Sequence, residues 1–171
     1  RRAYRLNLDG LRVSESAVLD PGLAIETLSR LELLGALFTA AEMCGAGASC
    51  VDYTVEYLTT RKQFGRLIGS YQALKHPTVE AHVAMEQSRS HLYAAAHCFE
   101  KPRDGEIAVR MAKAQVGPAL AYASDRSIQF HGGFGFTYEC DAQLYRRHAI
   151  YGEVRFGDAA YQRRRLADLI L

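Results

Sequence analysis

The spacing of apolar residues changes after Pro21-Gly22. Before this point, residues 5–13 alternate polar and apolar side chains around Asp9-Gly10, a pattern typical of a short strand or hairpin arm. After it, apolar residues recur about every 3.5 positions up to Gly65, which predicts one long helix. Small residues in this helix would let a neighbouring helix come close. They are Gly35, Gly45, Gly47 and Ser49.

The remainder of the chain repeats the helical period in shorter stretches. Helices are predicted over residues 70–99, 106–130, 140–154 and 158–169. Pro77 fits only near a helix start or a kink, Pro102 with Asp104-Gly105 predicts a loop, and Gly132-Gly133 suit a left-handed helix cap. The fold class is therefore all-α: an up-and-down four-helix-type bundle with an extra short C-terminal helix, preceded by a short strand remnant.

Composition narrows the class of protein. The chain has 171 residues, 49% of them hydrophobic, and a net charge of +2 with acidic and basic residues interleaved. One domain with its own core is expected, and nucleic acid is not an expected partner because no basic stripe is present. No apolar run approaches the roughly 18 residues of a membrane span, and the N-terminus lacks the apolar core of a signal peptide.

The four cysteines have neither metal-ligand spacing nor the density of a disulfide scaffold. They are Cys44, Cys50, Cys98 and Cys140. Free thiols packed on helix faces are expected, with no metal site and a cytoplasmic location.

Two short segments carry most of the chemical information. Arg61–Gly65 and Ser127–Thr137 are turn-rich polar segments, each at the end of a helical stretch. Their glycines allow a ligand to approach the backbone, while an Arg fork and aromatic rings suit a flat, phosphorylated molecule. The residues alone also fit simpler roles: a solvated basic helix end for the first segment and a helix stop for the second.

The order of these motifs resembles a known family. Four runs occur in the family's order and spacing: Tyr57–Gly65, Tyr71–Ala73, Met111–Lys113 and Ser127–Thr137. The chain is similar, from about Leu6 to its C-terminus, to the C-terminal helical domain of the acyl-CoA dehydrogenases. The resemblance implies that residues 1–20 are the end of a preceding β-domain and that residues 21–171 are the helical domain of a larger flavoprotein oxidoreductase of fatty acid or steroid side-chain degradation.

The resemblance also implies FAD as cofactor and an acyl-CoA thioester as substrate. In the similar enzymes the two segments reach across a subunit interface to the partner's flavin, so a homo- or hetero-oligomer is expected, with electron-transfer flavoprotein or a similar acceptor as a further partner. The residues expected at FAD are Arg61, Lys62, Gln63, Phe64, Tyr71, Gln72, Gln129, Phe130, His131, Gly132 and Gly133.

Arg30 lies where the family carries an Arg that binds the CoA moiety. From the residues alone, Arg30 and Glu26 form a surface pair at i,i+4 spacing. The acidic residue that the family often places three positions before this Arg is Thr27 here. Both readings stay open.

The catalytic base is where the sequence departs from the family. The family's base is a Glu in a Glu-Gly-Thr turn, and the alignment places Phe156 at that position; a phenyl ring cannot accept a proton. Some members carry the base just before the Arg equivalent to Arg30, and that position is Ser29. Glu153 and Asp158 are the nearest carboxylates, but each would need a different turn geometry.

Three hypotheses follow from this pattern. The first is a flavin-dependent acyl-CoA dehydrogenase subunit that lacks the base and assembles with a related subunit that carries it. The second is a self-sufficient dehydrogenase that uses Glu153, Asp158 or a residue outside this sequence. The third is a helical interaction module that binds neither FAD nor CoA.

Overall fold

The computed structural model describes residues 4–18 and 20–171, and the chain divides into two compact units, Arg1–Leu31 and Glu32–Leu171. In the first unit, a turn at Asp9-Gly10 is closed by the amide of Leu11, which donates to the carbonyl of Leu8 (3.1 Å), and a 3-10 helix, η1, spans Glu15–Ala17. The expected strand does not form within residues 4–18. A strand needs a neighbour for its backbone groups, and none is paired with this segment.

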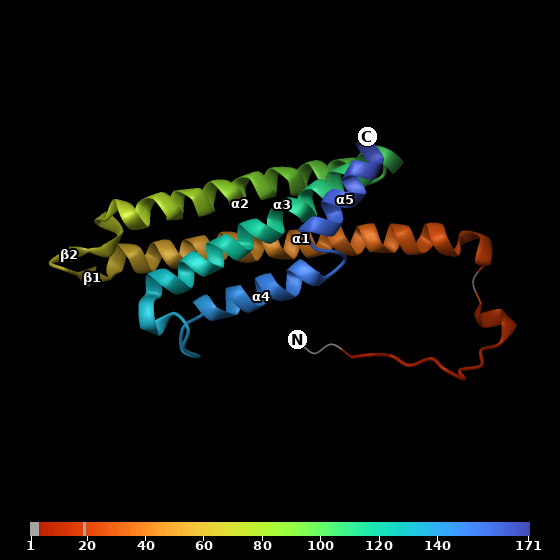
Figure 1. Ribbon diagram of the computed structural model, residues 1–171, viewed down its shortest axis with the longest axis horizontal. Helices are drawn as coiled ribbons and strands as arrows, with labels where there is room; N and C mark the ends of the chain where they lie inside the picture. The colour runs from red at the N-terminus through yellow and green to blue at the C-terminus, as the bar shows by residue number, and fades with distance from the viewer. Residues whose placement is uncertain (1–3, 19) are drawn as a thin grey trace. The chain divides into compact units, whose positions relative to one another are not determined.

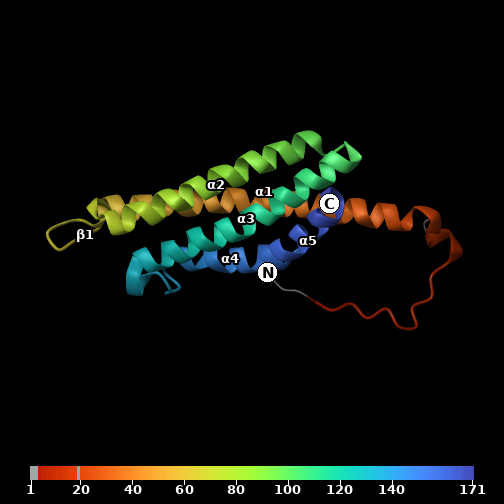
Figure 2. The ribbon, with the colours of Figure 1, turned by 45° about the horizontal axis from the view of Figure 1, so that its top comes forward.

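The described residues form five α-helices with short connections (Figures 1 and 2). They are α1 (Pro21–Thr60), α2 (Gln72–Cys98), α3 (Pro102–His131), α4 (Ala142–Val154) and α5 (Ala159–Ile170). Between α1 and α2 lie the strands β1 (Lys62–Gln63) and β2 (Arg66–Leu67) and the 3-10 helix η2 (Ile68–Ser70); the 3-10 helix η3 (Gly132–Phe134) follows α3. The all-α class predicted from the helical period is confirmed.

Two helix ends differ from the sequence prediction. Pro102 was expected in a loop, but it begins α3, because the first residue of a helix needs no amide hydrogen bond and suits the fixed φ of proline. Gly132 ends α3 with φ 62° and ψ −142°, and its amide donates to the carbonyl of Gln129. The positive φ explains the glycine, but the ψ lies outside the left-handed helical region that was predicted.

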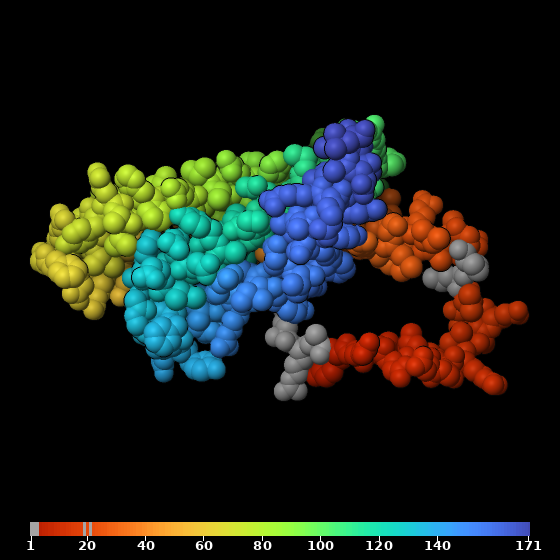
Figure 3. All heavy atoms as spheres, viewed as in Figure 1, coloured from red at the N-terminus to blue at the C-terminus, as the bar shows by residue number. Residues whose placement is uncertain are grey.

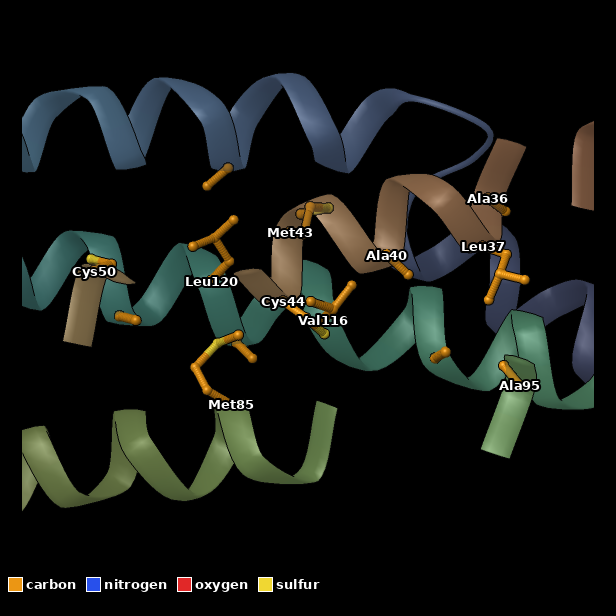
Figure 4. Close-up of a cluster of buried hydrophobic side chains, with 14 of the residues drawn as sticks. Ala36, Leu37, Ala40, Met43, Cys44, Cys50, Met85, Ala95, Val116 and Leu120 are labelled. Carbon is orange, nitrogen blue, oxygen red and sulfur yellow. The ribbon is translucent and has the colours of Figure 1, made fainter. Parts of the chain in front are cut away.

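The core of the second unit lies where α1, α2 and α3 meet. Met43 of α1, Met85 of α2 and Leu120 of α3 are almost completely buried in this cluster (Figure 4). Helix α3 also packs against α4 and α5, which lie over it in the space-filling view (Figure 3). A Cβ on Gly47 would lie 2.1 Å from the Met85 Cε, so this glycine does allow the close approach of α2, whereas Gly45 has no neighbour within 4 Å.

Helix α1 also passes a test of length and composition for a membrane span. The segment Glu15–Thr60 contains a window of 18 residues that is apolar enough to cross a bilayer, in contrast to the sequence expectation. Half of that window is buried inside the structure, as in the core helix of a soluble protein, so the finding is weak evidence for a span.

Candidate functional site

The two polar segments predicted from the sequence meet in one groove of about 880 Å³. The hairpin and the end of α3, which carry these segments, lie at the same end of the bundle (Figures 1 and 2). The end of α1, the β-hairpin, the start of α2 and the end of α3 with η3 form its walls. Its lining residues are Tyr57, Arg61, Gln63, Phe64, Ile68, Ala73, Leu74, Pro77, Arg126, Gln129, Phe130, His131, Gly132, Gly133 and Phe134.

A tight hairpin positions the first wall. Lys62 pairs with Leu67 and Gln63 pairs with Arg66, while Phe64 (φ 54°) and Gly65 (φ 80°) form the turn. Positive φ at both central residues gives the turn the twist that matches an antiparallel pair. The Phe64 side chain is 89% exposed at the tip. The hairpin therefore presents a bare aromatic ring directly beside Arg61 and Gln63.

A stack of three rings supports the second wall. The buried His131 ring lies between Tyr57 (4.1 Å between ring centroids) and Tyr53 (4.8 Å). Its Nδ1 is 2.8 Å from the carbonyl oxygen of Ser127. A carbonyl only accepts, so Nδ1 carries the proton, and in the neutral ring Nε2 is an acceptor. The end of α3 is thereby fixed against α1.

The groove is electropositive. Its lining residues include Arg61 and Arg126 but no aspartate or glutamate, and neither guanidinium forms an ion pair with a described carboxylate. The Nε of Arg126 is buried without a hydrogen-bond partner in the structure. Sequence reasoning missed Arg126, although its i,i+3 spacing to Gln129 on one face of α3 could have indicated it.

Not all of the predicted FAD residues line this groove. Lys62 is exposed on β1 and is not among the lining residues. Tyr71 meets the Phe64 ring edge-on (6.4 Å between centroids) and lies beneath the Arg66 guanidinium (3.9 Å), so it supports the hairpin. Gln72 is the first residue of α2 and is also outside the lining. Arg30 lies on α1 in the first unit.

The turn between α4 and α5 contains Phe156, at the position of the family base. Phe156 has φ 52°, which is uncommon for a residue with a bulky side chain. Its ring lies against α1, where a Cβ built on Gly35 would be 2.3 Å from the ring Cε1. The guanidinium of Arg155 is 5.5 Å from the same ring and 3.4 Å from the carboxylate of Glu42. An aromatic ring, 38% exposed, therefore occupies this position.

Side chains from α3 and α5 hold the backbone of the turn. The fully buried Lys113 donates from Nζ to the carbonyls of Glu153 (3.1 Å) and Gly157 (3.0 Å), and burial lowers the pKa of its ammonium. The carbonyl of Phe156 accepts a hydrogen bond from Gln162 Nε2 (2.6 Å). Gln162 in turn accepts from the buried Arg110 (3.0 Å). The turn is fixed through its backbone oxygens.

Both alternative bases have structural contacts. The Oε1 of Glu153 accepts a hydrogen bond from the amide of Ala159 (2.9 Å), and its Oε2 is buried without a hydrogen-bond partner. Asp158 is the N-cap of α5 and accepts from the amide of Tyr161 (2.7 Å). The capping contact accounts for Asp158 without a catalytic role, and Glu153 has a structural contact through one of its two oxygens.

The four cysteines form neither a disulfide nor a metal site among the residues that the structure describes. All four are free thiols, and burial raises the pKa of Cys44 and Cys50 to about 11. Across residues 4–18 and 20–171, His, Cys, Asp and Glu side chains do not gather in groups of three or more that could hold a metal ion.

Comparison with known proteins decides the family. Residues 30–171 match the family model of the acyl-CoA dehydrogenase C-terminal domain. The chain belongs to this family. Acyl-CoA dehydrogenase IpdE2 of Mycobacterium tuberculosis is 38% identical over 149 residues, which cover 87% of this chain and 42% of IpdE2. The chain thus spans less than half the length of this acyl-CoA dehydrogenase.

Solved structures agree with the fold of an acyl-CoA dehydrogenase domain. A chain of the ChsE4-ChsE5 complex from Mycobacterium tuberculosis superimposes with a TM-score of 0.78 at 28% identity, covering 86% of this chain and 39% of that one. The FAD complex of PigA gives a TM-score of 0.71 at 25% identity, covering 75% of this chain and 34% of that one. The solved structures similar to this chain therefore include an FAD complex and the ChsE4-ChsE5 complex.

Proposed function

We propose that this chain is the helical domain of an FAD-dependent acyl-CoA dehydrogenase subunit that lacks its own catalytic base. The proposal rests on two features that occur together in this chain. The cofactor segments meet in a single electropositive groove, whereas Phe156 fills the position of the base.

The groove fits the dinucleotide part of FAD. Arg61 offers a planar fork of donors that matches a phosphate, and the absence of carboxylates in the lining leaves this charge available. The exposed Phe64 ring offers a flat apolar face. Gln129 and the backbone of Gly132-Gly133 provide polar contacts at the opposite wall. The FAD complex of PigA, a relative, supports this assignment.

In the reaction we propose, FAD held at this groove would supply the acceptor for the hydride that leaves the β-carbon of the acyl thioester. The residues of this chain bind and orient: Arg61 neutralises phosphate charge, and Phe64 covers an aromatic face. The proton on the α-carbon must go to a carboxylate on the opposite side of the acyl chain. Phe156 offers no such acceptor, and we assign this role to a related subunit.

The contacts of Glu153 and Asp158 favour this proposal over a self-sufficient enzyme. Each carboxylate already accepts a backbone amide hydrogen bond beside α5. Moving either carboxylate toward a substrate would leave an amide of α5 without its hydrogen-bond acceptor. The existence of a two-subunit relative, the ChsE4-ChsE5 complex, supports the assembly that we propose.

Activity measurements on the full-length protein test the proposal. Purified alone, it should be yellow but show little acyl-CoA dehydrogenation, because loss of a general base costs about 10²–10⁴ in rate. Co-expression with a homologue that bears an intact Glu-Gly-Thr turn should restore turnover. Rapid turnover by the lone protein that disappears in Glu153→Gln or Asp158→Asn would instead make that carboxylate the base.

A colourless protein that does not bind added FAD would favour a different class of function. The bundle would then be an interaction module that retains the fold without the cofactor. The lining of the groove argues against this alternative, because two arginines without a carboxylate among the lining residues favour an anionic ligand.

A further inference from the structure

Arg126 is the feature of the groove that the family motifs leave unexplained. It lies on α3 one turn before Gln129, on the same face, and lines the groove. Its Nε is buried and has no hydrogen-bond partner. Leaving a buried donor of a charged group unsatisfied costs free energy, so this site favours a ligand that brings an acceptor.

Among the residues that the structure describes, Arg126 forms no ion pair with a carboxylate. The adjacent Asp125 is directed to Arg146, with 2.8 Å between its Oδ1 and the Arg146 Nε. The Tyr122 ring lies 5.4 Å from the guanidinium carbon of Arg126, and the hydroxyl of Tyr122 donates a hydrogen bond to Glu80 Oε2 (2.5 Å), so this carboxylate contacts the tyrosine and not the arginine. By contrast, the buried Arg110 forms an ion pair with Glu106. A structural arginine in this bundle is thus paired, and Arg126 is not.

Together with Arg61, this residue gives the groove two guanidinium groups and no carboxylate. We propose that Arg126 is a second phosphate-binding residue, which acts with Arg61 on the diphosphate of FAD. This inference rests on the proposed function. Two planar forks suit a diphosphate, which carries more than one negative charge and several acceptor oxygens.

Titration of the full-length apoprotein with FAD, followed by quenching of flavin fluorescence, tests the inference. Arg126→Gln should raise the Kd for FAD about tenfold or more, as expected for a lost charge-assisted hydrogen bond. ADP should compete with FAD in the parent protein, and its inhibition constant should rise by a similar factor in Arg126→Gln. Arg126→Lys should recover part of both affinities, because it retains the charge without the fork.

A matched control is Arg164→Gln, which removes an exposed arginine of α5 outside the groove. It should change neither constant. Thermal melting followed by far-UV circular dichroism should be equal for the parent protein and Arg126→Gln, which excludes general unfolding as the cause. The salt dependence of FAD binding should also be less steep in Arg126→Gln, since one phosphate contact is gone.

The outcomes separate this inference from the proposed function. If Arg61→Ala weakens FAD binding and Arg126→Gln does not, Arg126 has no phosphate role and the flavoprotein assignment stands. If Arg126→Gln weakens FAD binding without affecting competition by ADP, the residue acts elsewhere than at the diphosphate, and the inference is also overturned. If the parent protein binds no FAD, both fail.

Discussion

The ring of Phe156 lies against the α-carbon of Gly35, with no room for a side chain between them. A Cβ on Gly35 would be 2.3 Å from Cε1 and 2.4 Å from Cζ of the ring. These two residues are far apart in the sequence, and their contact joins the α4–α5 turn to α1. The glycine therefore has a packing role inside a helix, where glycine is otherwise unfavourable.

This contact predicts that Gly35→Ala changes the free energy of unfolding in opposite directions in the parent protein and in a Phe156→Ala background. Gly35→Ala should destabilise the protein by about 1–3 kcal/mol, because overpacking exceeds the helix propensity gained. In a Phe156→Ala background the same substitution should stabilise by roughly 0.5–1 kcal/mol, since only the propensity gain remains. Urea denaturation of the four proteins measures both effects. Equal effects of Gly35→Ala in the two backgrounds would contradict the contact.

Asp158 should behave as a helix cap. Asp158→Ala should lower the free energy of unfolding by about 1 kcal/mol, because the amide of Tyr161 loses its acceptor, whereas Asp158→Asn should retain most of the stability. Neither variant should alter turnover of the assembled enzyme by more than a small factor. A loss of turnover in Asp158→Asn at unchanged stability would show that the carboxylate takes part in catalysis.

Substitutions of Arg61 and of the adjacent Lys62 should differ in how much they lower FAD retention. Arg61→Ala in the full-length protein should lower FAD retention after desalting about tenfold or more, because it removes a charge-assisted contact without disturbing the core. Lys62→Ala serves as the matched control, since Lys62 does not line the groove. Flavin absorbance relative to protein measures both. Equal retention in the parent and Arg61→Ala proteins would exclude Arg61 as a phosphate ligand.

Cys50 should lower the free energy of unfolding at alkaline pH. Burial raises its pKa from 9.0 to about 11, so between these values the unfolded chain loses the thiol proton while the folded protein keeps it. The folded state then binds more protons, and the free energy of unfolding falls as pH rises from 9.0 toward 11.

Comparison with Cys50→Ala isolates this contribution, which is on the order of 2 kcal/mol at the upper end of the window. The variant should show a flatter dependence of stability on pH, measured by urea denaturation between pH 8 and about 11. Cys98→Ala is a suitable control because Cys98 is only partly buried. Parallel curves for the parent protein and Cys50→Ala would contradict the assignment.

The helical fold and the two polar segments that meet in the groove could be predicted from the sequence because both leave local signals. The helical period extends over whole helices, and the glycines and arginine of the groove stand at helix ends. The hairpin at Lys62–Leu67 was not predicted, because strands of two residues are too short to show an alternating pattern. The strand signal at residues 5–13 failed for the opposite reason: alternation was present, but a pairing partner was not.

The second arginine of the groove and the support of the α4–α5 turn also escaped prediction. Arg126 resembles any solvated helix residue until the fold shows its buried Nε. Lys113 lies on a helix face and is expected to be exposed, yet it is 0% exposed and binds two carbonyls. Long-range hydrogen bonds of this kind have no periodic signal in a sequence. They depend on which backbone oxygens another element brings within reach.

The support of the α4–α5 turn has an evolutionary consequence. Lys113 and Gln162 hold main-chain oxygens, and every amino acid supplies such an oxygen. The hydrogen bonds that hold the turn therefore do not depend on the side chain at position 156, although that side chain packs against Gly35 and its backbone has a positive φ. Replacing this one residue could add or remove a proton acceptor while the protein still folds. Two copies of a duplicated subunit could therefore diverge into one that carries the base and one that does not, and every variant along the way would remain folded.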